Sequence, residues 1–316
     1  MKIMLNAKGW QIFEPQTTLS GYNRPVNEKI SSGFRKIAIA PHPSLPEANK
    51  EAYKIAQFLK QQGQESLMAM LYEEKLVQSI EKHEIDLLIV LGGDGTMLRA
   101  GHICGPYDLP ILGINAGRFG FLMEIRLNEW KQYLPRLLKG DFWLEKRMML
   151  YCSHKRNGLE LSTHHVLNEV VVGRGKAVRP VHLETHVDGR YLTTYVADAL
   201  IAATATGSTA YALAAGGPIL PPELRNILLV AVAPHLSIDR GIVLAEGSSV
   251  RVIVHTDHDA LLCIDGQSPI PLIDEDQVDV CAAEHNACFV RFQDPGYFYR
   301  NLTPHMNRNP ATGIPR

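Results

Sequence analysis

The sequence predicts an α/β protein: an N-terminal Rossmann-like parallel α/β domain, followed by a C-terminal, mainly antiparallel β-sandwich domain. Three observations support this fold class. Up to about residue 139, short apolar runs alternate with segments whose apolar residues recur at helical spacing, which is typical of parallel β-α-β units. From about residue 142, helical spacing largely disappears and strand-like segments follow one another. Asp188-Gly189, between alternating apolar residues, indicates an antiparallel hairpin.

The α/β domain is predicted to span residues 34–141. The run Leu87–Leu91 is apolar throughout, so it suits a strand that is buried on both faces of a sheet. The first predicted helix has a proline at its start and a glycine after its end, and its apolar residues repeat at helical spacing. The predicted strands are 36–40, 86–91 and 109–114, and the predicted helices are 46–62, 73–82 and 128–139.

The β-rich domain is predicted to span residues 142–287. Residues 288–302 are expected to return to the first domain, beginning with a strand over Cys288–Phe292. Residues 1–33 are interpreted as an irregular extension, and 303–316 as a disordered tail because they contain three prolines and little apolar content. The predicted strands of the β-rich domain are 144–153, 164–173, 181–188, 191–196, 199–204, 227–232, 249–255, 260–265 and 277–282.

Composition and charge exclude several classes of function. The 316 residues carry a formal net charge of −1, which indicates no general attraction to nucleic acid or to acidic membranes. No apolar stretch approaches the roughly 18 residues that span a bilayer. The five cysteines are scattered without a C-x-x-C pair, and the 13 histidines form no ligand pattern. We therefore expect a cytoplasmic protein with reduced thiols, no nucleic-acid or membrane partner and no structural metal site.

The segment Ile85–Ala100 joins an apolar strand to a glycine-rich turn and the start of a helix. The turn Gly92–Thr96 contains three glycines, which allow the backbone to approach a ligand closely, and Met97–Ala100 reads as the first helical turn. Free N–H groups and the helix dipole favour a phosphate there. Asp94, inside the turn, suits a proton acceptor for a hydroxyl that is being phosphorylated, or a metal ligand. The alternative is an ordinary helix cap.

The common phosphate-binding sequences are missing from this chain. No G-x-G-x-x-G follows the first strand, and Gly175-Lys176 lacks the rest of a Walker A sequence. The run Thr206–Ala210 instead contains three hydroxyl groups and a glycine, which suit hydrogen bonding to sugar or phosphate. Tyr211 follows, and its aromatic ring suits stacking on a base. The alternative is a polar turn that caps a short helix over 210–215.

Other polar residues interrupt or end predicted strands, and ligands of parallel sheets bind beyond such ends. Asn115-Ala116-Gly117 follows a strand of the first domain and is expected to share a crevice with the glycine turn. Asn168-Glu169 lies in an otherwise apolar strand, so one of the two side chains faces a core or a site. Asp198 lies in another apolar run, and Asp265-Gly266-Gln267 ends a further strand. Each alone fits a turn, but together they outline one cleft.

Together these motifs resemble those of the NAD kinase family, over about residues 36–300. The glycine turn alone is shared with lipid kinases and phosphofructokinases, whereas the ordered set of motifs is highly specific. The matching segments are Leu91–Thr96 for the family's G-G-D-G-T, Gly113–Leu122 for G-x-N-x-G-x-L-G-F-L, Asn168-Glu169 for N-E, Thr206–Ile219 for T-G-S-T-A-Y…S-x-G-G-P-I, and Asp265–Gln267 for D-G-Q.

The resemblance implies ATP-dependent phosphorylation of the adenosine-ribose 2′-hydroxyl of NAD, which gives NADP. It also implies a need for Mg²⁺ or another divalent cation, and a homodimer or homotetramer. Asp94 would accept the proton, and Gly95 would lie against the nucleotide. From the motifs and the resemblance together, the residues expected to bind the nucleotides are Gly92, Gly93, Gly95, Thr96, Arg99, Asn115, Asn168, Glu169, Arg179, Asp198, Thr206, Thr209, Ala210, Tyr211, Ala214, Asp265 and Gln267.

Several positions depart from the family pattern. Val196 stands where an arginine is common, Ala197-Asp198-Ala199 replaces S-D-G, Ala205 replaces a proline, and Ala214 replaces a common serine. The missing arginine and serine remove possible hydrogen bonds to a nucleotide. Two alternatives therefore stay open beside the kinase. One is a non-catalytic NAD(P)-binding sensor, and the other is a lipid or small-alcohol kinase that shares the glycine turn.

Overall fold

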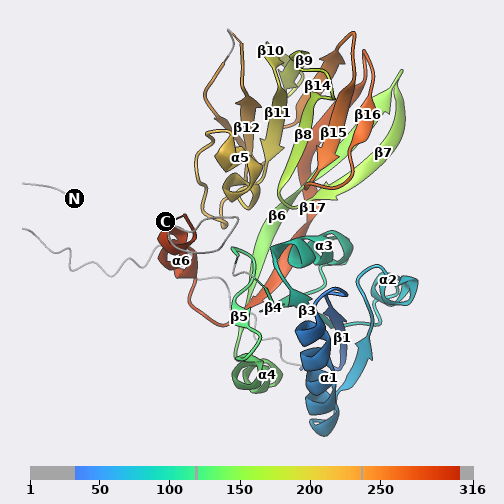
Figure 1. The fold of residues 1–316 in the computed structure, drawn as a ribbon, viewed down its shortest axis with the longest axis vertical. Coiled ribbons are helices and arrows are strands. Elements are labelled where there is room, and N and C mark those ends of the chain that lie inside the picture. Colours follow the sequence, from blue (N-terminus) through green and yellow to red (C-terminus); the bar gives the residue numbers. More distant parts are fainter. Residues whose placement is uncertain (1–32, 118–119, 236–237, 307–316) are drawn as a thin grey trace, which may run out of the picture.

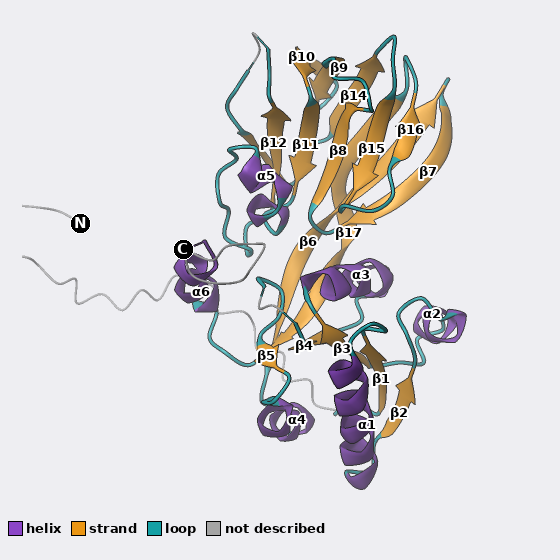
Figure 2. Cartoon of the chain, viewed as in Figure 1, coloured by secondary structure: helices purple, strands orange, loops and turns teal. Residues whose placement is uncertain are grey.

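The computed structural model describes residues 33–117, 120–235 and 238–306. An α/β part lies at the bottom of Figure 1 and a β-sandwich part lies above it. The long strands β6 (Trp143–Arg156) and β17 (Gln277–Arg291) run from one part into the other. Figure 2 shows α1 to α4 grouped around the lower strands, while the upper part consists mainly of strands. The predicted fold class is therefore confirmed.

The α/β part has parallel strands in the order β2-β1-β3-β4, and β5 pairs with β4. All six residues of β3 are buried, because helices cover both faces of this sheet. Its side chains alternate between two cores: Ile89 packs with α1 and α4, whereas Val90 packs with α2 and α3. The elements are β1 (Lys36–Pro41), α1 (Pro46–Gln61), β2 (Glu65–Met68), α2 (Glu74–Glu81), β3 (Leu87–Gly92), α3 (Asp94–Cys104), β4 (Ile111–Asn115), β5 (Ile125–Arg126) and α4 (Trp130–Leu138).

The β-sandwich part consists of two facing sheets. One has the order β13-β12-β11-β8-β15-β16, and the other contains β10-β9-β14-β17 with β6 and β7 beside it. The apolar side chains between the sheets form one core, which includes Tyr195 and Leu262. The remaining elements are β7 (Leu159–Val166), β8 (Glu169–Arg174), β9 (Val181–Val187), β10 (Arg190–Ala197), β11 (Ala199–Ala203), α5 (Tyr211–Ala214), β12 (Asn226–Val232), β13 (Ile242–Ala245), β14 (Val250–His255), β15 (Ala260–Ile264), β16 (Ile270–Leu272) and α6 (Tyr297–Met306).

Strand β17 makes the two parts continuous. It pairs with β6 in an antiparallel ladder along its length, with β14 near its start, and with the parallel strand β4 near its end. One 11-stranded sheet therefore runs from the α/β part into the sandwich. Phe289 of β17 pairs with Ile111 of β4 and is fully buried at this junction. The predicted boundary between residues 287 and 288 falls inside β17, and the division into domains stays a prediction.

Two predicted element boundaries are corrected. The strand predicted over 164–173 is two strands, β7 and β8, because the chain bends at Leu167 and Asn168. Apolar residues on both sides of the bend conceal it in the sequence. The helix predicted to begin at Met97 begins at Asp94, because the turn after β3 is a single residue. Asp94 therefore lies in the first turn of α3 rather than in the loop before it.

The end of the chain is more ordered than predicted. The separate strands predicted at 277–282 and 288–292 are one strand, whose register shifts between Ala282 and Asn286. Helix α6 includes residues 303–306, which were expected to be disordered, because the buried side chains at its start anchor it. Residues 1–32 and 307–316 lie outside the described residues. The strands β2, β5, β13 and β16 have only two to four residues, too few for a pattern in the sequence.

None of the helices in the described part of the chain is long and apolar enough to cross a membrane. The predicted Asp188-Gly189 hairpin is confirmed, since Arg190 pairs with Val187 across the turn. Both turn residues have positive φ angles, 53° and 74°, as this kind of tight hairpin requires.

Replacing Phe289 by Ala is expected to lower the free energy of unfolding by about 3–5 kcal/mol, because the substitution leaves a cavity where the two parts join. Urea unfolding followed by tryptophan fluorescence measures this. Leu159→Ala is the matched control, since Leu159 is 70% exposed and its loss should change the midpoint little. Equal midpoints for the two variants would contradict a stabilising role of this junction.

Candidate active site

A cavity of about 230 Å³ lies where the α/β part, the β-sandwich part and α6 meet, and we call it the junction cavity. Its lining combines polar and aromatic residues from segments that are far apart in the sequence. Only the tertiary structure assembles them. The lining residues are Asp94, Gly95, Leu98, Phe121, Leu122, Arg147, Asn168, Ala205, Thr206, Thr209, Ala210, Pro222 and Phe298.

The glycine turn places Asp94 at the N-terminus of α3. Gly93 precedes the helix, its N–H donates to Thr96 Oγ1 at 3.4 Å, and its carbonyl oxygen accepts the N–H of Thr96 at 2.9 Å. A Cβ on Gly92 would lie 2.2 Å from Thr96 Oγ1, so only glycine fits there. Gly92, Gly93 and Thr96 therefore build the turn, while Gly95 lines the junction cavity.

Backbone amides fix the Asp94 carboxylate. The N–H of Phe121 donates to Oδ2 at 2.7 Å, and the N–H of Leu122 donates to Oδ1 at 3.2 Å. A Cβ on Gly120 would lie 2.0 Å from Oδ2, so a glycine at 120 makes room for the carboxylate. Burial raises the pKa of Asp94 above its ordinary value, although these N–H groups and the charge of Arg291 oppose the rise. A raised pKa makes the carboxylate a better proton acceptor.

A buried ion cluster borders the junction cavity, and its Arg147 is one of the lining residues. Arg147, which is 3% exposed, donates to Thr206 Oγ1 at 3.2 Å, to Glu145 Oε2 at 3.1 Å and to Tyr297 OH at 2.8 Å. Arg291 donates to the same Glu145 oxygen at 2.7 Å. Burial alone would raise the pKa of Glu145, but the two guanidinium groups hold it at about 2. Glu145 is therefore ionised at neutral pH.

Asp265 anchors the chain where β8 begins. Its carboxylate accepts three successive backbone N–H groups, those of residues 167–169, at 2.7 to 2.8 Å. His102 of α3 also contacts this carboxylate, and the side chain of Gln267 lies 2.9 Å from Nδ1 of His102. These contacts tie α3 to the β-sandwich part and hold the backbone of Asn168 beside the cavity. The structure gives Asp265 a structural role, and its contact with a nucleotide stays a prediction.

A second cavity of about 470 Å³, which we call the sandwich cavity, includes Glu169, Asp198 and Tyr211 in its lining. Oε2 of Glu169 is buried and has no hydrogen-bond partner among the described residues. The pKa of Glu169 is raised to about 7, mainly by burial and to a smaller extent by the negative charge of Asp265. Nε of Arg174 lies 2.9 Å from Oδ1 of Asp198. Arg174 of β8 therefore places a guanidinium group near Asp198, although Val196 stands where an arginine is common in the family.

The two cavities bring together many of the predicted site residues. The junction cavity is lined by Asp94, Gly95, Asn168, Thr206, Thr209 and Ala210, and the sandwich cavity by Glu169, Asp198 and Tyr211. Asn115 ends β4, and its Oδ1 accepts the N–H of Gly117 at 2.8 Å, so it shapes the next turn.

Nine predicted residues line neither cavity. Six of them have structural contacts described above: Gly92, Gly93, Thr96, Asn115, Asp265 and Gln267. The other three are Arg99, Arg179 and Ala214. Arg99 and Ala214 are exposed, and Arg179 lies 3.6 Å from Asp257 at the surface. Their contacts with a nucleotide stay predictions.

Sequence reasoning did not single out Arg147, Glu145, His102 or the rings of Phe121 and Phe298. A signal existed for Glu145 and Arg147, because Glu145-Lys146-Arg147 interrupts an apolar strand segment and alternate residues of a strand face the same side. Phe121 lies in the segment Gly113–Leu122 that resembles the family pattern, whereas no comparable signal marks His102 or Phe298. The importance of these residues comes from contacts with distant parts of the chain, such as the bond of Arg147 to Tyr297, 150 positions away.

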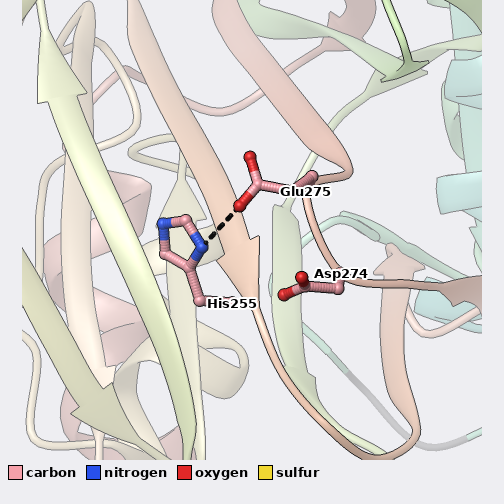
Figure 3. A group of neighbouring side chains, drawn as sticks. All are labelled: His255, Asp274 and Glu275. Atoms are coloured by element: carbon pink, nitrogen blue, oxygen red, sulfur yellow. Dashed lines mark ion pairs between the residues drawn. The ribbon is translucent and has the colours of Figure 1, made fainter.

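One group of side chains in the described residues has a metal-ligand arrangement, and it lines neither cavity. Ligand atoms of His255, Asp274 and Glu275 lie within 4.8 Å of one another (Figure 3). Nδ1 of His255 lies 3.0 Å from Glu275, and Nε2 lies 3.2 Å from Glu184. The carboxylates of Asp274 and Glu275 are exposed, so water solvates them, and a surface ion pair accounts for the group without a metal ion.

Family models of ATP-NAD kinase domains and sequence relatives that are NAD kinases match this chain. Residues 32–142 match the family model of the ATP-NAD kinase N-terminal domain, and residues 167–292 match that of the ATP-NAD kinase C-terminal domain. An NAD kinase from Citrifermentans bemidjiense is 40% identical over 276 residues, which cover 84% of this chain and 96% of the relative. An NAD kinase from Chloroflexus aurantiacus is 36% identical over 276 residues, which cover 87% of this chain and 100% of the relative.

Two solved structures share the fold. Yeast NADH kinase complexed with NADH has a TM-score of 0.77 at 23% identity, with 90% of this chain and 91% of that chain covered. An NAD kinase from Archaeoglobus fulgidus in complex with ATP has a TM-score of 0.68 at 25% identity, with 85% of this chain and 97% of that chain covered. Together the two family models cover most of the chain, including the glycine turn and most of the residues that line the two cavities. The chain therefore belongs to the NAD kinase family.

Proposed function

We propose that this protein transfers the γ-phosphoryl group of ATP to the 2′-hydroxyl of the adenosine ribose of NAD, which gives NADP. The position of Asp94 carries the proposal: its carboxylate lines the junction cavity at a helix N-terminus and is held by two backbone N–H donors. Asn168 and Thr206 line the same cavity and suit hydrogen bonds to sugar hydroxyls. The relatives named above are NAD kinases, and the archaeal one was solved with ATP.

In the proposed step, Asp94 accepts the proton of the ribose 2′-hydroxyl while that oxygen forms a bond with the γ-phosphorus. The bond from this phosphorus to the oxygen that bridges it to the β-phosphate breaks, and its electron pair stays on ADP. Because the carboxylate is fixed before the substrate arrives, its orientation requires no rearrangement during the reaction. The raised pKa of Asp94 favours the proton transfer.

The N-terminus of α3 suits the phosphates of the donor. Its free N–H groups and its dipole favour an anion. A Cβ on Gly95 would meet no protein atom within 4 Å, although Gly95 lines the cavity. This glycine therefore keeps space open for a ligand rather than for another part of the chain.

The sandwich cavity suits the rest of the NAD molecule. Glu169 and Asp198 offer hydrogen-bond acceptors there, and Tyr211 is 44% exposed, so its ring is accessible for stacking on a base. Asn168 and Glu169 are adjacent but line different cavities. The start of β8 thus lies between the two, and one nucleotide contacting both residues would extend from one cavity to the other.

Mg²⁺ or another divalent cation is part of the proposal as a companion of ATP. Among the described lining residues of the junction cavity, Asp94 has the carboxylate, and both its oxygens accept backbone N–H groups. These residues do not form a metal-binding set of their own. The phosphates of the donor would bind the cation, which would neutralise part of their negative charge.

We further propose a cytoplasmic homodimer or homotetramer whose ligands are small nucleotides. The five cysteines are unpaired, and Cys104, Cys152 and Cys288 are buried, which suits a reducing compartment. The resemblance to the family supports the oligomeric state. Light scattering of the purified protein measures it directly.

Purified protein incubated with Mg²⁺, NAD and ATP is expected to form NADP. The same assay with polyphosphate in place of ATP identifies the phosphoryl donor.

Asp94→Asn should lower kcat by about 10²–10⁴-fold, because the variant lacks the proton acceptor. Circular dichroism and the melting temperature serve as controls for the fold. NAD binding without any NADP from either donor would favour the sensor, and phosphorylation of a lipid or another small alcohol instead of NAD would favour the second alternative.

Gly120→Ala is expected to lower kcat while the protein stays folded, because the new methyl group would collide with the carboxylate of Asp94. The carboxylate must then leave its two N–H donors, so it loses its orientation. Gly95→Ala is a useful comparison, since its methyl group would meet no protein atom and should mainly raise KM for the nucleotides. Wild-type kcat in Gly120→Ala would show that this contact does not position the base.

Glu169 is expected to make stability depend on pH. Its pKa is about 7 in the folded protein against an ordinary value of 4.5, so the folded state holds the proton more tightly. Stability therefore falls as pH rises from about 4.5 through 7, by up to about 3 kcal/mol at 1.36 kcal/mol per unit. Glu169→Gln should remove this loss, which urea unfolding at pH 5 and pH 8 measures. Equal pH dependence in variant and wild type would contradict the assignment.

A further inference from the structure

We propose that Arg147 binds the phosphoryl group in transfer, as the positively charged group of the junction cavity. This inference rests on the proposed function, because it assumes that a phosphoryl group occupies the cavity. Of the described residues that line the cavity, Arg147 has the positive charge and Asp94 has the carboxylate. The cavity therefore combines a proton acceptor for the hydroxyl with a cation for the group that the hydroxyl attacks.

The ion cluster that borders the cavity has more positive than negative charge among its ion-paired groups. Glu145 contacts both Arg147 and Arg291, so one ionised carboxylate faces two guanidinium groups. The carboxylates of Asp94 and Glu124 are instead bound by backbone N–H groups, those of Phe121 and Leu122 for Asp94 and those of Phe292 and Gln293 for Glu124. A buried charge without a counter-ion is unfavourable. A phosphoryl group in the cavity supplies the missing negative charge.

Arg147 is also held in place before a ligand arrives. Its Nη1 donates to Thr206 Oγ1 at 3.2 Å, and its Nη2 donates to Tyr297 OH at 2.8 Å and to Glu145. Its buried Nε has no hydrogen-bond acceptor among the described residues. Because the side chain is fixed from three directions, no reorganisation is needed when negative charge develops on the transferred group.

The two buried arginines differ in what they face. Arg291 is 1% exposed, does not line the junction cavity, and donates Nη1 to the carbonyl oxygen of Leu122 at 2.8 Å. Since the N–H of Leu122 holds Asp94, Arg291 supports the base from behind. Arg147 lines the cavity itself. During transfer, charge is spread over the three equatorial oxygens of the phosphoryl group, and contact with one of them is the role that we assign to Arg147.

Arg147→Met and Arg147→Lys, compared with Tyr297→Phe, test this assignment. Tyr297→Phe removes a hydrogen bond from the same cluster without removing a charge, so it reports on a purely structural contribution. Two measurements are made on each full-length protein. One is kcat and KM for ATP and for NAD, and the other is the rise in melting temperature caused by tripolyphosphate, which needs no turnover.

Arg147→Met should lower kcat by about 10²–10³-fold and abolish the effect of tripolyphosphate, because one fixed donor to the developing charge is lost. Arg147→Lys keeps the charge but loses the planar fork, so its kcat should be at least about tenfold lower at a near-normal melting temperature. Tyr297→Phe removes one of the contacts that hold Arg147 but leaves its charge, so kcat should fall much less than in Arg147→Met. Equal kcat in Arg147→Met and Tyr297→Phe, with tripolyphosphate binding retained, would overturn the assignment.

Other outcomes are equally informative. If Arg147→Met does not fold, Arg147→Lys decides the question: a kcat equal to that of the wild-type protein would reject the role of Arg147 in binding the phosphoryl group. A rise in KM for NAD alone, at unchanged kcat, would mean that Arg147 holds the pyrophosphate of NAD, which also overturns the proposal. If the wild-type protein forms no NADP, the proposed reaction fails, whereas the difference in tripolyphosphate binding between Arg147→Met and Tyr297→Phe still decides whether Arg147 binds phosphate.

Discussion

The pairing of β6 with β17 is the constraint on which the rest of this structure depends. Both strands are long, and they run from the β-sandwich part into the α/β part, where β17 ends beside β4. The pairing places Glu145 and Arg147 of β6 next to Arg291 of β17. It also brings Phe298 of α6 into the lining of the same cavity as Asp94 and Gly95. Without this ladder, the residues that surround the junction cavity would belong to separate bodies.

The chemistry of the site depends on contacts that fix groups before a ligand binds. Backbone N–H groups of Phe121 and Leu122 hold the Asp94 carboxylate, and the arginine behind them holds the carbonyl oxygen of Leu122. A second set of contacts, through Asp265, holds the backbone at the start of β8. These bonds leave little freedom in the cavity walls. Such rigidity suits a phosphoryl transfer in which the protein mainly positions groups and neutralises charge.

Burial gives the carboxyl groups of this site different properties. Glu145 is held ionised by two guanidinium groups, whereas Glu169 has an unpaired oxygen and a pKa of about 7. Asp94 lies between these cases, because burial raises its pKa while N–H donors and a distant positive charge lower it. A carboxyl group in this site is thus a permanent counter-ion, a group that titrates near neutral pH, or a proton acceptor. The groups that surround each carboxyl determine which of these properties it has.

The departures from the family pattern also gain a physical meaning from the structure. Val196 provides no positive charge next to Asp198, but Arg174 of the adjacent strand lies 2.9 Å from that carboxylate. The pairing of β8 with β11 makes this contact possible, because Arg174 N–H also bonds to the carbonyl oxygen of Asp198. A charge missing at one position of a strand can therefore be present from its neighbour. A comparison of motifs along the sequence does not show this.

The sequence by itself determined the local features of the protein. Helical and strand-like periodicity predicted the two-part fold, and the apolar run before the glycines predicted a strand buried on both faces, because these features depend on residues close together in the chain. The ordered motifs indicated Asp94 and the family. Only the tertiary structure decided that β17 is one strand, that α3 begins at Asp94 and that Asp265 holds backbone amides. It alone brought Arg147 to Tyr297, since contacts between residues 150 positions apart leave no periodic pattern in the sequence.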